Sequence, residues 1–273
     1  MRGEFFDLDG VRLYGYAAGR RGRGVPVVLV HGFPTSSHLW TEVVPLLPEG
    51  HRVLVLDLLG YGRSDRPGAR PLSLRAHAER LLGVLDLLHV ERACVVGHEM
   101  GAAVAQLLAT RWPARVSHLG LVSAAMSEAW PARELKLARA TLPLTRHLPP
   151  NWLLTLLRRD LVRGYAVQER GLHSVEMYLR PFTGADGRDA LTAHLAQLDV
   201  AELAALEARA GELAMPVAVA WGAEDPFLPV ALGRTLHERL PGSTLHVAPD
   251  GRHFLPEESP QHVAAAVADL LTR

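Results

Sequence analysis

The sequence predicts an α/β protein with a doubly wound, mostly parallel sheet. Two observations support this class: short apolar runs recur along the chain, and stretches of helical periodicity separate them. Such runs are typical of strands buried on both faces, and their alternation with helices is typical of a parallel sheet. The apolar runs are 25–30, 53–56, 93–96, 116–122, 217–221 and 244–247, and the helical stretches are 38–47, 73–88, 100–111, 230–240 and 259–272.

The chain begins with a predicted β-hairpin. Residues 3–8 and 11–17 have strand-like patterns and meet at Asp9-Gly10, a pair that favours a tight turn because glycine tolerates a positive φ. In a sheet wound by right-handed crossovers, the loops after the parallel strands lie along one edge. We therefore expect a functional site at that edge.

The alternation of strands and helices stops between residues 126 and 210. Helical patterns there are interrupted by prolines, which predicts an inserted helical segment rather than more sheet. The predicted organisation is a core of residues 1–125 and 211–273, with a helical lid at 126–210 over the loop edge.

Composition excludes several classes of protein. The 273 residues have a formal net charge of zero, so we expect no nucleic-acid partner. The single cysteine, Cys94, cannot form an internal disulfide and is typical of a reducing compartment. No uncharged apolar run approaches the about 18 residues of a membrane span, and no apolar signal region precedes the first strand. We therefore expect a cytoplasmic protein without a membrane contact, and the oligomeric state stays open.

The motif Gly97-His98-Glu99-Met100-Gly101 lies between a buried strand and an apolar helix. A strand that turns sharply into a helix needs small residues two before and two after the turn, since larger side chains would collide there. The residue at the apex is then exposed above the sheet edge, next to a helix N-terminus that favours negative charge. This placement makes Glu99 the main catalytic candidate.

Two further candidates follow later strands of the same predicted sheet. Asp225 comes directly after the run 217–221, and His253 comes after the final strand. The order apex residue, acid, histidine is that of a catalytic triad on this type of sheet. The backbone N–H groups of Phe33 and Met100 are expected to form a donor pair for a developing oxyanion.

These motifs resemble the α/β-hydrolase superfamily over nearly the whole chain. His31-Gly32-Phe33-Pro34 is similar to the H-G-x-P motif of epoxide hydrolases and fluoroacetate dehalogenases, and the run from Asp57 to Ser64 is similar to their D-x-x-G-x-G-x-S stretch. The resemblance implies that Asp225 is the acid and His253 the base. Position 99 departs from the pattern, because esterases of this fold have serine there and epoxide hydrolases and dehalogenases have aspartate. Met100 also departs from haloalkane dehalogenases, which usually have a halide-binding tryptophan at that position.

The chemistry of a glutamate at the apex leaves three hypotheses. A carboxylate with a pKa of about 4.3 is ionised without a base, and its attack on a haloalkane or epoxide carbon would form an ordinary ester that His253 and water could hydrolyse. The extra methylene moves the carboxylate by up to ~1.5 Å relative to aspartate. Glu99 is therefore predicted to be a nucleophile, a general base for water, or part of a binding protein without catalysis.

The lid contributes candidates for substrate binding. Tyr165 and Tyr178 are its two tyrosines, and epoxide hydrolases use lid tyrosines to protonate the epoxide oxygen, although packing within the lid explains each of them better. Trp130 and Trp152 are expected to line or close the pocket. No metal-ligand spacing, phosphate-binding glycine loop or dinucleotide fingerprint occurs, so we expect no metal and no cofactor. The expected partner is a small, largely apolar substrate.

Overall fold

The computed structural model describes residues 3–19, 22, 24–131, 136–137, 139–141, 150–197 and 199–273. Within them the chain forms an eight-stranded sheet with the order β1-β2-β4-β3-β5-β6-β7-β8. The first three strands in this order pair antiparallel, and every later neighbour pairs parallel. This confirms the predicted fold class. The strands are β1 (Gly3–Leu8), β2 (Val11–Ala18), β3 (Val27–Val30), β4 (Val53–Leu56), β5 (Ala93–His98), β6 (Val116–Val122), β7 (Val217–Gly222) and β8 (Thr244–Ala248).

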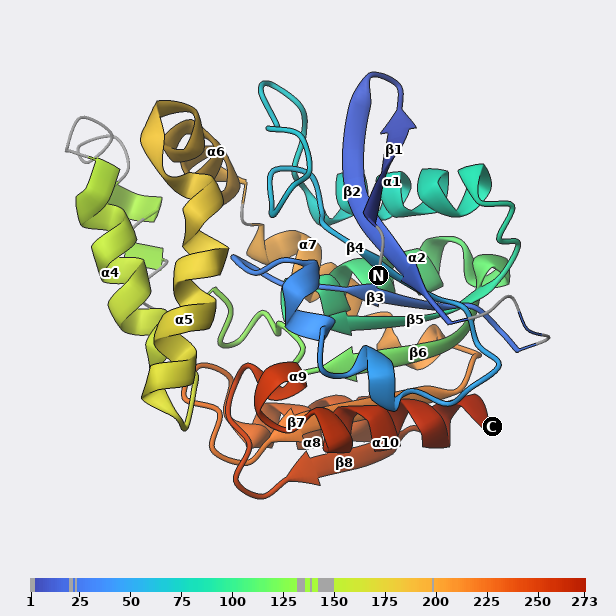
Figure 1. The fold of residues 1–273 in the computed structure, drawn as a ribbon. Coiled ribbons are helices and arrows are strands. Elements are labelled where there is room, and N and C mark those ends of the chain that lie inside the picture. The colour runs from blue at the N-terminus through green and yellow to red at the C-terminus, as the bar shows by residue number, and fades with distance from the viewer. Residues whose placement is uncertain are drawn as a thin grey trace.

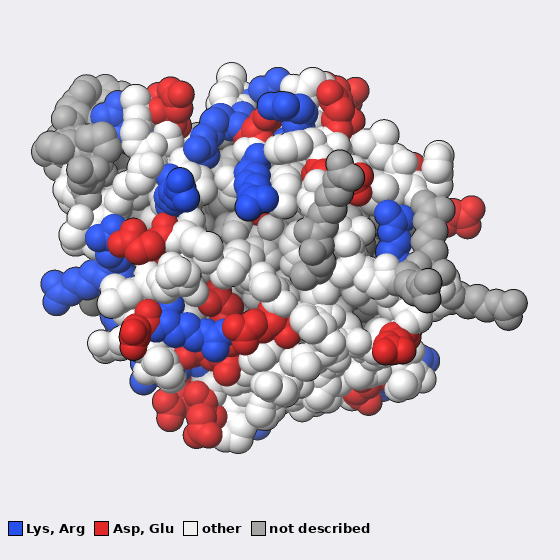
Figure 2. Space-filling model, in the orientation of Figure 1, with Lys and Arg blue, Asp and Glu red and all other residues white. Residues whose placement is uncertain are grey.

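Helices cover both faces of the sheet (Figure 1). On one face α1 (Leu74–Leu87) packs on α2 (Met100–Arg111), which contacts β5 and β6. On the same face α8 (Val230–Arg239) packs beside β7 and β8, because the right-handed crossover from β7 to β8 runs in the same direction as that from β5 to β6. On the other face α10 (Pro260–Leu271) contacts β6 and β7. No described helix is long and apolar enough to cross a membrane. Acidic and basic side chains are interspersed over the face in Figure 2, as expected for a chain of zero formal net charge.

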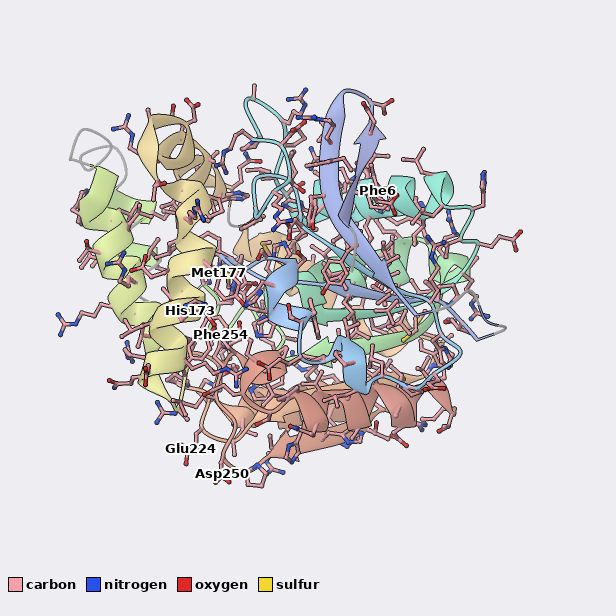
Figure 3. All side chains as sticks on the ribbon, viewed as in Figure 1. Phe6, His173, Met177, Glu224, Asp250 and Phe254 are labelled. Carbon is pink, nitrogen blue, oxygen red and sulfur yellow. The ribbon has the colours of Figure 1, made fainter. Side chains whose placement is uncertain are left out.

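The N-terminal hairpin extends the sheet at one end. Strand β2 pairs with β4, and β1 contacts α1. The side chain of Phe6 is buried on the side of the hairpin toward α1 (Figure 3). Burial of an aromatic ring of this size removes apolar area from water and holds the hairpin against the core.

Two predicted details of the core were wrong. The stretch 38–47 forms two 3-10 turns, at Ser37–Trp40 and Val44–Leu46, instead of one helix. Pro45 explains this, because it has no N–H to donate and its ring would clash with the preceding turn of an α-helix. A short helix, α9 (Leu255–Glu258), follows the last strand and was not predicted, since four residues are too few to show a helical period.

The segment between β6 and β7 is helical where it is described. It contains α4 (Pro150–Val162), α5 (Gln168–Leu179), α6 (Gly184–Ala196) and α7 (Val200–Glu207). Figure 1 shows α4, α5 and α6 standing together at one end of the molecule, beyond the carboxyl ends of the parallel strands. The boundaries predicted for the lid, 126 and 210, stay a prediction.

Close backbone packing explains the two glycines around the apex between β5 and α2. A Cβ atom on Gly97 would lie 2.2 Å from the carbonyl oxygen of Gly101. A Cβ atom on Gly101 would lie 2.4 Å from the carbonyl oxygen of His31. Backbone atoms cannot move aside as the end of a side chain can, so both positions require glycine.

We predict that Gly101→Ala destabilises the protein by about 1–3 kcal/mol, because the added methyl group overpacks the junction of strand and helix. Urea unfolding measures this change in the free energy of unfolding. The matched control is Gly211→Ala, since a Cβ atom on Gly211 would meet only a carbonyl oxygen at 3.9 Å. Equal stabilities of the two variants would contradict the packing argument.

Candidate active site

Glu99 occupies the apex between β5 and α2. Its backbone has φ 51° and ψ −117°, a combination that non-glycine residues rarely adopt. Such conformations cost on the order of 1–3 kcal/mol and persist where the surrounding structure holds them, often at active sites. The side chain of Glu99 is only 4% exposed and lines an internal cavity beneath the lid.

One oxygen of the Glu99 carboxylate accepts both predicted oxyanion donors. The N–H of Phe33 donates to Oε2 at 2.8 Å, and the N–H of Met100 donates to the same oxygen at 2.5 Å. The backbone at position 32 can approach the Glu99 side chain because this residue is glycine: a Cβ atom on Gly32 would lie 2.6 Å from Oε2. The structure therefore brings the two donors together, and Glu99 itself occupies the point on which they converge.

His31 fixes the loop that presents the Phe33 N–H. Its Nε2 accepts the N–H of Leu58 at 2.9 Å, so the proton of this imidazole is on Nδ1, which lies 2.9 Å from the carbonyl oxygen of Gly32. The loop after β3 is thereby tied to the loop after β4, which limits movement of the oxyanion donors.

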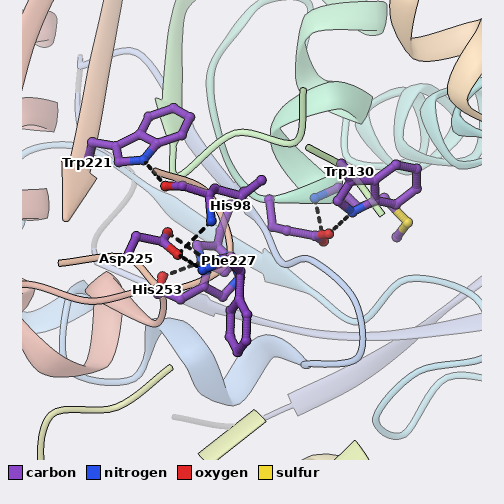
Figure 4. A network of polar contacts seen from close by, with 9 residues as sticks. His98, Trp130, Trp221, Asp225, Phe227 and His253 are labelled. Atoms are coloured by element: carbon purple, nitrogen blue, oxygen red, sulfur yellow. Dashed lines mark hydrogen bonds and ion pairs between the residues drawn. The ribbon is translucent and has the colours of Figure 1, made fainter. Parts of the chain in front are cut away.

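The second oxygen of Glu99 has a different donor. The indole Nε1–H of Trp130 donates to Oε1, and the Trp130 side chain is buried against the same cavity. The dashed lines at Trp130 in Figure 4 mark this part of the network. Trp130 thus lines the pocket, as the sequence predicted. The two oxygens of Glu99 differ in their donors: Oε1 accepts the indole N–H, and Oε2 accepts two backbone N–H groups.

His253 and Asp225 form a second, adjacent group (Figure 4). Nδ1 of His253 lies 2.9 Å from Oδ2 of Asp225. The other oxygen of Asp225 accepts the N–H groups of Phe227 and Leu228, each at 2.9 Å. Nε2 of His98 lies 2.9 Å from the carbonyl oxygen of His253, so His98 positions the backbone of the histidine rather than facing the cavity. The Asp225 carboxylate is therefore fixed, and it orients the imidazole.

The expected direct contact between Glu99 and His253 is absent. The ion pairs that the described residues form within 4.0 Å include His253 with Asp225, but they do not include His253 with Glu99. The longer side chain reaches the oxyanion donors and Trp130 instead of the imidazole. Both residues line one cavity of about 40 Å³, which exceeds the roughly 10–15 Å³ that a water molecule needs.

The charges of the site influence one another. Burial raises the pKa of the Glu99 carboxyl above its ordinary value, although hydrogen-bond donors and the charge of His253 oppose the rise. Burial lowers the pKa of His253, but the carboxylates of Asp225 and Glu99 outweigh burial, so its net shift is upward. The protonated imidazole and the two carboxylates therefore stabilise one another's charged forms.

Tyr165 and Tyr178 are buried, both hydroxyls donate to Oε1 of Glu257, and neither residue lines the cavity with Glu99. The hydroxyl of Ser174 donates to the other oxygen of Glu257 at 2.6 Å. These contacts satisfy a buried carboxylate and agree with the packing interpretation. A contact of either tyrosine with substrate stays a prediction.

Trp152 is half-buried near the start of α4 and is not among the residues that line the cavity with Glu99. Later residues of α4 line this cavity, among them Leu157 and Leu161. A role of Trp152 in closing the pocket stays a prediction.

Sequence analysis missed Asp160, which lies between these two leucines and also lines the cavity. Its Oδ1 is 2.7 Å from Nη1 of Arg163, and its charge contributes to the raised pKa of His253. The signal was present in the sequence, because residues 157, 160 and 161 share one face of a helix and a carboxylate on an apolar face is unusual. Among the described residues, no cluster of three or more histidine, cysteine or acidic side chains is suited to hold a metal ion.

The chain is similar to hydrolases over its whole length. A family model described as "alpha/beta hydrolase fold" matches residues 25–260. The uncharacterized hydrolase YugF of Bacillus subtilis is 28% identical, over 97% of this chain and 96% of that protein. The 2-hydroxymuconate semialdehyde hydrolase of Pseudomonas sp. CF600 is 28% identical, over 92% of this chain and 88% of that protein.

A solved structure gives the same result. An α/β hydrolase fold protein from Burkholderia ambifaria superposes with a TM-score of 0.87 and 27% identity, covering 97% of each chain. The nearer resemblance to epoxide hydrolases and dehalogenases stays a prediction. Family model, relatives and fold agree on the class: the chain belongs to the α/β-hydrolase fold family and is an enzyme of the hydrolase class.

Proposed function

We propose that the protein hydrolyses a small, largely apolar haloalkane-like substrate through an ester on Glu99. The observation that carries this proposal is the unequal treatment of the two carboxylate oxygens. Oε2 is held by two backbone N–H groups, whereas among the described residues Oε1 has one donor, the indole N–H of Trp130, beside a cavity that both residues line. Oε1 is therefore the nucleophilic oxygen, and Oε2 becomes the carbonyl oxygen of the ester.

The occupied oxyanion site argues against ester substrates. Hydrolysis of an ester requires its carbonyl oxygen to enter the donor pair as charge develops there. In this structure Oε2 of Glu99 fills that position. Attack by a carboxylate on an ester would also form an anhydride, which is less stable than the reactants. A substrate attacked at saturated carbon needs no second oxyanion site.

In the first step Oε1 attacks the saturated carbon and forms a C–O bond while the carbon–halogen bond breaks. The electron pair of that bond leaves with the halide, so no proton is needed. As Oε1 loses its negative charge it becomes a weaker acceptor, and the Trp130 N–H can turn to the departing anion. Epoxide opening is less well supported, since its oxygen requires a proton and the lid tyrosines donate to Glu257.

In the second step water hydrolyses the ester. His253 accepts a proton from a water molecule in the cavity, and the water oxygen attacks Cδ of Glu99. Negative charge develops on Oε2, between the N–H groups of Phe33 and Met100 that already point at it. The bond between Cδ and Oε1 then breaks, and Oε1 leaves as the oxygen of the alcohol with the proton from His253. Glu99 remains as a carboxylic acid that contains the oxygen of the water molecule, and it releases its proton to solvent to restore the carboxylate. The separation of Glu99 from His253 supports this role, because a water molecule has to fit between them.

We predict that His253→Gln accumulates an ester on Glu99. Alkylation does not need the imidazole, whereas hydrolysis loses its base, so incubation with 1-bromopropane should add the mass of a propyl group to the peptide that contains Glu99. Mass spectrometry of the intact protein and of its peptides measures the adduct. Glu99→Gln should carry no adduct and should lower turnover by more than about 10³-fold.

Glu224→Gln is the matched control for this experiment, because Glu224 is an exposed acid next to Asp225 and does not line the cavity. It should behave as the parent protein does. Loss of turnover in both Glu99→Gln and His253→Gln without an adduct would favour Glu99 as a general base. Absence of turnover in the parent on haloalkanes, epoxides and esters would favour a binding protein.

The proposal also predicts a pH dependence. The carboxylate of Glu99 contributes to the raised pKa of His253 in the free enzyme, and this charge is absent once Glu99 is esterified. The pKa of His253 should therefore be lower in the ester than in the free enzyme. Since only the neutral imidazole accepts a proton, ester hydrolysis should slow as the pH falls through this lower pKa. Rapid-quench measurement of ester breakdown gives the first pKa, and NMR titration of the imidazole in the free enzyme gives the second. Equal values would contradict the mechanism.

A serine at position 99 should reverse the substrate preference. Glu99→Ser empties the donor pair and places a hydroxyl above the strand–helix turn, near the His253 and Asp225 pair. We expect hydrolysis of 4-nitrophenyl acetate to exceed that of Glu99→Ala by about 10²-fold or more. Both variants remove Oε2 from the oxyanion donors, so the difference between their rates measures the contribution of the serine nucleophile. Equal rates for the two variants would show that Oε2 does not determine which substrates react.

A further inference from the structure

A second, larger cavity lies between the core and the lid. Its volume is about 540 Å³, which is in the range of small-molecule sites. Its walls come from β2, from the loops after β3 and β4, and from the end of α5 with the turn at Arg180–Phe182. It shares no lining residue with the cavity at Glu99, so its ligand is a question separate from the proposed hydrolysis.

Three arginines give this cavity a positive charge. Arg63 and Arg66 come from the loop after β4, and Arg180 comes from the end of α5. None of the three forms an ion pair within 4.0 Å with a described carboxylate. Figure 2 shows basic side chains gathered on this face, over the loop after β4 and the end of α5.

One carboxylate, that of Asp57, lines the cavity, and backbone N–H groups already donate hydrogen bonds to it. Asp57 accepts the backbone N–H of Ser37 at 2.6 Å and that of Arg63 at 2.8 Å. Three guanidinium groups thus face one carboxylate, and these four groups together carry an excess of two positive charges. A ligand with two negative charges would balance them.

One tyrosine hydroxyl adds a neutral donor. The hydroxyl of Tyr14 accepts Nη1 of Arg63 at 2.9 Å, and its own proton remains available as a donor. Tyr16 also lines the cavity, but its hydroxyl is buried and faces the side chain of Thr41, so it does not reach a ligand.

We propose that this cavity binds the phosphate group of a small phosphate monoester. Phosphate carries about −1.5 to −2 charges at neutral pH and has three acceptor oxygens, which match the excess charge and the guanidinium and hydroxyl donors. A carboxylate would supply one charge and two oxygens. Arginine is also the side chain best suited to pair with phosphate oxygens through two parallel N–H groups.

The site joins two parts of the chain that must separate when the lid opens. Arg63 and Arg66 belong to the core, whereas Arg180 and Met177 belong to the helix α5 region, and Figure 3 shows Met177 on the side of α5 toward the core. A ligand that contacts both parts binds the closed arrangement more tightly than an open one. Phosphate binding should therefore stabilise the closed form.

Isothermal titration calorimetry with glycerol 3-phosphate tests the proposal, with sodium chloride at matched ionic strength as the reference. We expect saturable binding, weakened about tenfold or more by Arg63→Gln and by Arg180→Gln. Tyr14→Phe removes only the hydroxyl that bonds to Arg63 and should weaken binding by about threefold. Circular dichroism checks that each variant is folded.

Arg234→Gln is the matched control, because Arg234 is exposed on α8 and does not line the cavity. It should leave the affinity unchanged. Vesicles containing phosphatidic acid distinguish a lipid headgroup from a free ligand. Absence of saturable binding, equal weakening by the control variant, or binding to vesicles alone would overturn the proposal.

Discussion

Two backbone N–H groups, those of Phe33 and Met100, converge on one point above the sheet edge, and most properties of the site follow from what occupies that point. An aspartate or serine at position 99 is shorter, whereas the extra methylene of Glu99 brings Oε2 to 2.8 Å and 2.5 Å from the two nitrogens. The carboxylate is then fixed by the same donors that would stabilise a substrate oxyanion. The same placement directs the carboxylate away from His253. In the proposed mechanism it also argues against carbonyl substrates and leaves Oε1 as the oxygen that reacts.

One set of contacts holds the lid and the segment that carries His253. Glu257, four residues after His253, accepts hydroxyl groups from Tyr165, Tyr178 and Ser174 of the lid. The aromatic ring of Phe254 stacks on Tyr165 at a centroid distance of 4.5 Å, in the region that Figure 3 shows between α5 and α9. Because a cavity of about 40 Å³ admits only a few atoms, a larger substrate requires the lid to move. Such movement acts directly on the segment that carries His253.

The fold could be predicted from the sequence because its buried strands are apolar on both faces and its helices are amphipathic. The bounds differ by one or two residues where hydrogen bonding decides them: β3 begins at Val27, since Pro26 has no N–H to join the ladder. The positions of Glu99, Asp225 and His253 could be predicted as well, because each follows a parallel strand. The order of the strands then places all three at one edge.

Side-chain partners could not be predicted in the same way. The sequence gives no sign that Glu257 is buried beside the lid tyrosines, because that contact joins residues 79 to 92 positions apart. The reach of Glu99 to Trp130 likewise depends on where the chain returns after β6. Asp160 is different, since the spacing of residues 157, 160 and 161 was sufficient to place it on the cavity face. Local periodicity thus identifies a residue's face, and tertiary contacts decide its partner.

In the proposed mechanism the fixed charge on Oε2 also decides which step the oxyanion donors would accelerate. In the free enzyme they already stabilise a full carboxylate, so they give little additional stabilisation to alkylation, in which negative charge leaves Glu99. In the ester Oε2 is a neutral carbonyl oxygen, and charge returns to it only as water attacks. The same two N–H groups are therefore stronger partners of the transition state than of the ester ground state, which is the condition for catalysis. His253 changes in the same direction, because its pKa is raised partly by a Glu99 charge that esterification removes. Both effects favour hydrolysis of the glutamyl ester. Without them this step would be slow.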